Sequence, residues 1–105
     1  MTSSFDLRID ETLLAIEEAI DDSGVDIDYD TISGILTLVF PNDSKVILNR
    51  QSATNQLWIA AKSGGFHLDW QDNGWFCVGE QATLNQLLSR VCTEQLKENV
   101  TFELP

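Results

Sequence analysis

Apolar side chains near the start of the chain follow the repeat of a helix. Five of them stand three or four positions apart: Phe5, Ile9, Leu13, Ile16 and Ile20. This spacing places them in one stripe along an amphipathic helix. It predicts a helix over residues 5–22 that ends near Gly24, because glycine is common just past a helix C-terminus.

Alternating patterns and turn residues dominate the middle of the chain. In residues 26–32, three aspartates alternate with Ile27, Tyr29 and Thr31, as in a strand whose two faces differ. Other short apolar runs are separated by glycine, proline, asparagine and aspartate, which favour turns. The pattern predicts strands over residues 26–32, 35–40, 45–49, 56–61, 66–71 and 75–78.

Helical spacing returns near the end of the chain. Thr83 and Gln86 fit a capping box, in which each side chain accepts a hydrogen bond from the other residue's backbone N–H. The apolar residues that follow keep a helical repeat to about Lys97: Leu84, Leu87, Leu88, Val91, Cys92 and Leu96. A last short strand is expected over residues 100–104.

The order of helix, strands and helix defines the fold class. Strands joined by tight turns pair antiparallel, and two terminal helices can cover only one face of their sheet. We therefore expect an α+β two-layer sandwich, with both helices on one face of an antiparallel sheet of about six or seven strands. A chain of 105 residues supports one such domain, residues 1–105.

The sequence carries no recognisable membrane or export signal. No stretch approaches the roughly 20 apolar residues of a membrane span, and the N-terminus lacks a basic region followed by an apolar one. Cys77 and Cys92 lie in apolar segments without metal-ligand spacing, so both are expected to be buried thiols. The expected location is the cytoplasm.

The charge of the chain is strongly negative and locally concentrated. The chain has 17 acidic and 6 basic residues, a net charge of −11. Residues 1–30 alone hold ten acidic residues and one basic residue. Such a surface argues against binding to nucleic acid or to anionic membranes, and favours cations or basic proteins as partners.

Seven of these acids form the candidate metal site, which we call the acidic ridge: Glu17, Glu18, Asp21, Asp22, Asp26, Asp28 and Asp30. Carboxylates near a helix C-terminus and aspartates in a strand oppose local preference. Carboxylate oxygens suit hard cations, so helix end and strand are expected to form one ridge that binds divalent or trivalent ions weakly. Thr31 and Thr37 stand where an EF-hand loop needs glycine and glutamate, which excludes that motif. The alternative is a solvated acidic face.

No catalytic motif is found in the sequence. His67, the only histidine, is expected beside Asp69 on the sheet surface. No nucleophile motif, zinc motif or phosphate-binding loop accompanies this pair. The chain is therefore not expected to be an enzyme.

Trp58 is the candidate anchor for a protein partner. If Leu57 and Ile59 face the helices, strand alternation turns Trp58 toward solvent. A tryptophan in that position is either an incidental surface aromatic or an interface anchor. The candidate partner-binding residues are Asn49, Arg50, Gln51 and Trp58.

Two segments carry a resemblance to a known family. Residues 44–51 read Ser-Lys-Val-Ile-Leu-Asn-Arg-Gln, and residues 56–69 read Gln-Leu-Trp-Ile-Ala-Ala-Lys-Ser-Gly-Gly-Phe-His-Leu-Asp. With the acidic first helix and strand, they resemble the frataxin family in its short bacterial form, over nearly the whole chain. The link at residues 23–25 is slightly shorter than is usual in that family, which leaves open which helix acids meet which strand acids. The tail after the second helix is expected to leave the groove between the helices almost uncovered.

The resemblance implies a function in iron chemistry. It implies that iron, as Fe2+ or Fe3+, binds weakly along the acidic ridge, where other divalent or trivalent cations substitute. It also implies that the protein regulates or supplies iron for iron–sulfur cluster assembly, through contact of the partner-binding residues with the cysteine desulfurase and also with the cluster scaffold protein. A monomer that forms oligomers with iron is expected. The alternative is an acidic adaptor that docks on a basic protein and meets metal incidentally.

Overall fold

The computed structural model describes residues 4–71 and 74–102. A long first helix, α1 (Ser4–Ser23), precedes the strands, and a second helix, α2 (Leu84–Leu96), follows them. The strands are β1 (Asp28–Ile32), β2 (Ile35–Val39), β3 (Lys45–Gln51), β4 (Gln56–Ala61), β5 (Gly64–Gln71), β6 (Gly74–Cys77) and β7 (Ala82–Thr83). No helix in these described ranges is both long and apolar enough to cross a membrane.

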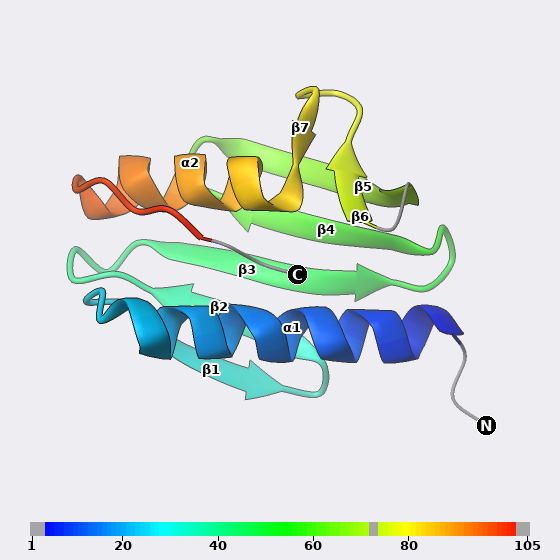
Figure 1. Cartoon of the computed structure of the whole chain (residues 1–105), viewed down its shortest axis with the longest axis horizontal. Coiled ribbons are helices and arrows are strands. Elements are labelled where there is room, and N and C mark those ends of the chain that lie inside the picture. Colours follow the sequence, from blue (N-terminus) through cyan, green and yellow to red (C-terminus); the bar gives the residue numbers. More distant parts are fainter. Residues whose placement is uncertain (1–3, 72–73, 103–105) are drawn as a thin grey trace.

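The strands form a simple antiparallel meander. Each strand pairs with the next, so their order in the sheet is their order in the chain. Figure 1 shows both helices on one face of this sheet, with α1 over the side of β1 and β2. The predicted α+β two-layer sandwich is confirmed.

The core lies between the sheet and the two helices. α1 buries the residues of its predicted stripe after Phe5: Ile9, Leu13, Ile16 and Ile20. The sheet contributes alternate residues of its central strands: Leu36, Leu38, Val46, Leu48, Leu57, Ile59 and Leu68. Burial of each such side chain stabilises the fold by roughly 1.5–3 kcal/mol. This free energy determines which side of each central strand faces the helices.

The hairpin between β1 and β2 has a turn of only two residues. Ile32 pairs with Ile35, which leaves only Ser33 and Gly34 in the loop. Both have positive φ, 52° and 77°, as a two-residue hairpin turn that matches the twist of the strands requires. This turn fixes the register of β1, and with it the faces on which the acids of β1 lie.

α2 begins with the predicted capping box. Thr83 Oγ1 accepts a hydrogen bond from the backbone N–H of Gln86, and the Gln86 side chain accepts one from the backbone N–H of Thr83. Both cysteines are free and buried, as predicted. Burial raises the pKa of the Cys92 thiol to about 12, so that thiol stays protonated and unreactive at neutral pH.

The segment after α2 differs from the prediction. Residues 100–102 form no strand, and residues 103–104 lie outside the described residues, as do residues 72 and 73 of the predicted turn. Val100 and Phe102 are buried. Thr93 Oγ1 bonds both backbone groups of Val100, and Ser89 Oγ accepts from the N–H of Phe102. This segment therefore packs against α2 (Figure 1) and adds Val100 and Phe102 to the hydrophobic core.

Candidate functional site

The acidic ridge starts on the last two turns of α1. Its helix row consists of Glu17, Glu18, Asp21 and Asp22, and only Glu17 is half-buried. Two hydroxyl groups of β1 reach this row. Tyr29 Oη donates to Asp21 Oδ2 at 2.8 Å, and Thr31 Oγ1 donates to Glu17 Oε2. These bonds tie the end of α1 to the edge of the sheet.

The pKa of Tyr29 responds to the negative charge of this row. The hydrogen bond to Asp21, together with slight desolvation and the negative charges of Asp21 and Glu17, raises the pKa of the Tyr29 phenol above 10.0. The phenol therefore stays a hydrogen-bond donor to the carboxylate across the neutral range.

The acids of β1 lie on the other side of the sheet. Because Tyr29 and Thr31 face α1, strand alternation turns Asp28 and Asp30 to the open face, opposite Val39 and Thr37 in the neighbouring strand. We call Asp28 and Asp30 the strand row. Asp26 is exposed in the link before β1. The expected single ridge is therefore wrong in one respect, because the edge strand divides it into two rows.

Basic side chains do not compensate the acidic ridge. In the described part of the chain, the ion pairs join Arg50 to two acids of the first turns of α1 and Arg90 to Glu80 and Glu94. None of them includes a ridge carboxylate. Among residues 4–71 and 74–102, no three histidine, cysteine, aspartate or glutamate side chains come close enough to hold one metal ion together. The ridge thus offers hard oxygen ligands without a preformed cage.

Trp58 lies on the open face, as its strand alternation predicts. It stands opposite Asn49 of β3 and His67 of β5. Its ring stacks on His67, with centroids 4.2 Å apart and planes 12° from parallel. Its Nε1 donates to Gln56 Oε1 at 2.9 Å, and Gln56 Nε2 donates to Asp69 Oδ1 at 3.1 Å. Trp58 is therefore half-buried and held in a single orientation.

A shallow hollow of about 170 Å³ adjoins Trp58 on the same face. Its lining includes Ile47, Ala60 and Gly65, which are small or apolar. Asn49 and His67 add polar groups to this lining. This part of the open face can receive a side chain of a partner.

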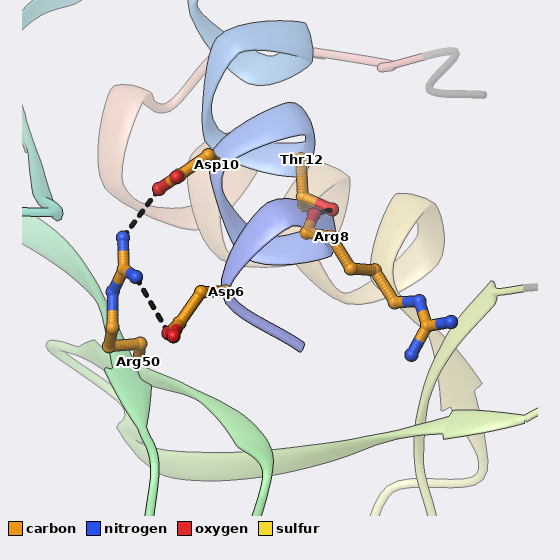
Figure 2. A network of polar contacts seen from close by, with 5 residues as sticks. All are labelled: Asp6, Arg8, Asp10, Thr12 and Arg50. Carbon is orange, nitrogen blue, oxygen red and sulfur yellow. Dashed lines mark hydrogen bonds and ion pairs between the residues drawn. The ribbon is translucent and has the colours of Figure 1, made fainter. Parts of the chain in front are cut away.

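Arg50 does not belong to this face. It stands opposite the buried Leu57, so it faces the helices, and its prediction as a contact on the open face is wrong. Figure 2 shows its guanidinium between Asp6 and Asp10 of α1, with Nη1 2.9 Å from Asp6 Oδ1 and Nη2 2.5 Å from Asp10 Oδ1. Gln51 and Asn49, one position away on either side, share the open face with Trp58.

The environment of Arg50 is that of a structural cation. Burial alone would lower its pKa, but hydrogen bonds to Asp10 and Asp6 and their charges outweigh burial and raise it. A Cβ at Gly34 would stand 2.6 Å from Arg50 Nη2, so the hairpin turn closes over the guanidinium. Arg50 therefore joins three elements: α1, β3 and the β1–β2 turn.

Comparison with known proteins identifies the family. The frataxin-like domain matches residues 1–98. The chain belongs to the frataxin family. Frataxin from Psychromonas ingrahamii, studied for stability modulation within the CyaY family, is 36% identical over 94% of both chains, with a TM-score of 0.87.

More distant frataxins share the fold. The trimeric frataxin of the yeast Saccharomyces cerevisiae, complexed with ferrous iron, is 22% identical over 93% of this chain and 89% of its own, with a TM-score of 0.70. A second trimeric yeast structure, with the full-length N-terminus, has a TM-score of 0.69 at 22% identity, over 93% of this chain and 83% of its own.

Some contacts of this frataxin family member were not foreseen from its sequence. Tyr29 and Thr31 are the hydroxyl donors to the helix row, and Gln56 and His67 hold Trp58. The signal for the first pair was their position between the aspartates of an alternating strand. The signal for the second pair required the register of three neighbouring strands, which no local pattern contains.

Proposed function

We propose that this protein binds iron weakly and reversibly on the acidic ridge, and that it regulates or supplies iron for iron–sulfur cluster assembly through contact with the cysteine desulfurase and the cluster scaffold. It acts without catalysing a reaction of its own, in the cytoplasm. The observation that carries the proposal is the ridge itself: seven carboxylates that no described lysine or arginine neutralises, in a member of the frataxin family.

The carboxylates of the ridge suit a metal ion that binds weakly and is released to another protein. Carboxylate oxygens are hard ligands for Fe2+ and Fe3+ and also for other divalent and trivalent cations. Without a cage of three converging ligands, each ion is held by one or two carboxylates and water, which gives low affinity and rapid exchange. The yeast frataxin complexed with ferrous iron supports iron as the physiological metal.

The open face links metal binding to the partner. The strand row shares this face with Asn49, Gln51 and Trp58. Three strand spacings of about 4.8 Å separate β4 from β1, so a partner seated on Trp58 lies about 15 Å from the edge strand that carries Asp30. Negative charge attracts a basic protein at long range, and the tryptophan supplies desolvated contact area at short range.

The protein is proposed to be a monomer in the absence of metal. Its net charge of −11 opposes self-association at low salt. Iron that neutralises the ridges of neighbouring copies would favour oligomers. The trimeric state of the yeast protein supports such assembly.

The second candidate function is an acidic adaptor that binds metal only incidentally. The lack of three converging ligands among the described residues favours it. The two functions differ in what the ridge must do, because an adaptor needs its charge but not its oxygen geometry.

An anaerobic titration with Fe2+, followed by amide resonances, tests the proposal. We expect line broadening centred on residues 17–30, with a Kd on the order of micromolar or weaker. Asp28→Asn with Asp30→Asn should weaken this binding. Asp43→Asn with Glu98→Gln removes the same charge from exposed positions outside the ridge and should not. Equal loss in both variants would show that bulk charge is sufficient, which favours the adaptor. Broadening confined to His67 and the cysteines would contradict ridge binding.

A further inference from the structure

β1 is an edge strand whose outer side is unpaired. The sheet begins with β1, and within the described ranges only β2 pairs with it. In a two-residue hairpin, the residues that flank the turn exchange both backbone hydrogen bonds. Ile32 is such a residue, so every second residue before it, Asp30 and Asp28, also bonds to β2. The backbone N–H and C=O groups of Tyr29 and Thr31 therefore point outward.

This edge lacks the usual geometric protection. The β1–β2 pairing is continuous over five residue pairs, without a bulge, and β1 contains neither proline nor lysine. Natural edge strands commonly use these devices to prevent pairing with another chain. Four of the five residues of β1 are exposed, and Tyr29 is half-buried.

Negative charge is the remaining protection of this edge against pairing, and it excludes acidic strands but not basic ones. Asp28 and Asp30 flank the edge on the open face, and Glu17 and Asp21 flank it on the helix face. A second copy of this chain would place acids beside acids, which is unfavourable between neighbouring strands. A strand with basic side chains meets attraction on both faces.

We propose that the outer edge of β1 is a docking site for an extended, basic segment of a partner protein, which adds to the sheet as a further strand. On the open face, its basic side chains lie beside Asp28 and Asp30, and an apolar side chain lies beside Ile32, which is 65% exposed. On the helix face, lysine or arginine reaches Glu17 and Asp21. Main-chain bonds to Tyr29 and Thr31 hold the segment, as in other cases of strand addition.

The inference goes beyond the proposed function. It requires neither iron on the ridge nor a partner on Trp58. A failure of strand addition would leave iron binding untouched, and the two results are measured separately.

Peptide binding tests the proposal on the ligand side. The probe is a short capped peptide in which lysine alternates with threonine and valine. Two variants carry backbone N-methyl groups on one or the other set of alternate residues, which leaves the charge unchanged. In an added strand only one set of N–H groups faces β1, so we expect one methylated peptide to bind about tenfold more weakly and the other to bind as the parent does. Equal affinity for all three peptides would show attraction by charge alone and would overturn strand addition.

Amide hydrogen exchange tests it on the protein side. Bound parent peptide should slow exchange of the Tyr29 and Thr31 amides by about tenfold or more, because these are the outward N–H groups. The amides of Asp30 and Ile32 already bond to β2 and should change little. Unchanged exchange at Tyr29 and Thr31 under saturating peptide would contradict the site.

A pair of variants separates backbone from side chain. Thr31→Pro and Thr31→Val both lose the hydroxyl that bonds Glu17, but only proline lacks the N–H. Proline is tolerated in an edge strand where its N–H would face solvent. We expect Thr31→Pro to bind the peptide about fivefold to tenfold more weakly than Thr31→Val. Equal binding by the two variants would refute the role of this N–H, and if Thr31→Pro does not fold, the methylated peptides decide.

Discussion

Tyr29 shows how one side chain shapes the acidic ridge. Its neutral hydroxyl donates a hydrogen bond to the carboxylate of Asp21. Asp21 lies at a helix end where carboxylates are otherwise unfavourable. A charge-assisted hydrogen bond of this kind offsets part of that cost. The same bond commits Tyr29 to the helix side, which sends the neighbouring aspartates to the open face.

The titration of Tyr29 is the prediction at this scale. Tyr29 is the only tyrosine, so the near-ultraviolet absorbance of tyrosinate reports it alone. We expect its pKa to lie above 10.0. The folded state holds the phenol proton more tightly than the unfolded state, so this contribution to stability is present below about pH 10 and is lost as pH rises through the folded-state pKa. Asp21→Asn should return the pKa toward 10.0.

Asp22→Asn is the matched control, because it removes the same charge from the same turn without touching Tyr29. It should lower the pKa of Tyr29 less than Asp21→Asn does. If the two variants lower it equally, the raised pKa reflects diffuse charge and the hydrogen bond to Asp21 has no special role.

Arg50 shows where sequence reasoning about single residues failed. Its position in the motif Asn49-Arg50-Gln51 suggested one surface patch, but neighbours in a strand face opposite sides. Arg50 continues the buried series of Val46 and Leu48 at every second position, so alternation placed it against α1. Its partners, Asp6 and Asp10, lie more than 35 residues earlier, and no local pattern indicates them.

The charges in the C-terminal half of α1 are electrostatically unfavourable. Its acids stand four positions apart, next to the negative end of the helix dipole, and its last turn contains no basic residue. Arg50 compensates acids only in the first turns of the helix (Figure 2). The hydrogen bonds from Tyr29 and Thr31 offset only part of this electrostatic cost, which is why the arrangement points to ligand binding.

Neutralising acids of α1 should therefore stabilise the metal-free protein. Glu18 and Asp22 form no hydrogen bond or ion pair in the described structure, so Glu18→Gln with Asp22→Asn removes repulsion and loses no contact. We expect a gain of about 0.5–1 kcal/mol and a melting temperature a few degrees higher in low salt. Added salt or divalent cations should reduce the difference in melting temperature between this variant and the wild type.

Thermal unfolding of Asp43→Asn with Glu98→Gln supplies the comparison, since it changes the net charge equally outside the ridge. Its melting temperature should stay closer to that of the wild type. A ridge variant that melts below the wild type in metal-free, low-salt buffer would show that these acids stabilise the fold.

At the scale of elements, most of the fold could be predicted from the sequence. The helical stripe of α1, the capping box of α2 and the alternation of β4 are local signals, and their elements lie where predicted. The strand expected over residues 100–104 failed because Val100 and Phe102 alternate in the same way whether they pair with a strand or pack on helices. β7 has only two residues, which is too short for a periodic signal.

For the whole molecule, the arrangement of surfaces follows from the sheet. α1 and α2 fill one face (Figure 1), so partners must use the open face, the edge of β1 or the outer surface of the helices. The strand row and Trp58 share the open face, whereas the helix row lies beyond the edge strand. The sequence could predict which residues are acidic and which tryptophan turns outward. The division of the ridge depended on the register of β1, which a two-residue turn fixes.

The central claim is that the ridge and the open face act together in cluster assembly. The most direct measurement is the rate of cluster formation with purified cysteine desulfurase, scaffold and limiting iron. The account predicts that the wild-type protein changes this rate, and that Asp28→Asn with Asp30→Asn, or Trp58→Ala, removes most of the change. Asp43→Asn with Glu98→Gln should keep the effect. A rate that the wild-type protein leaves unchanged, or that every variant changes as the wild type does, would contradict the account.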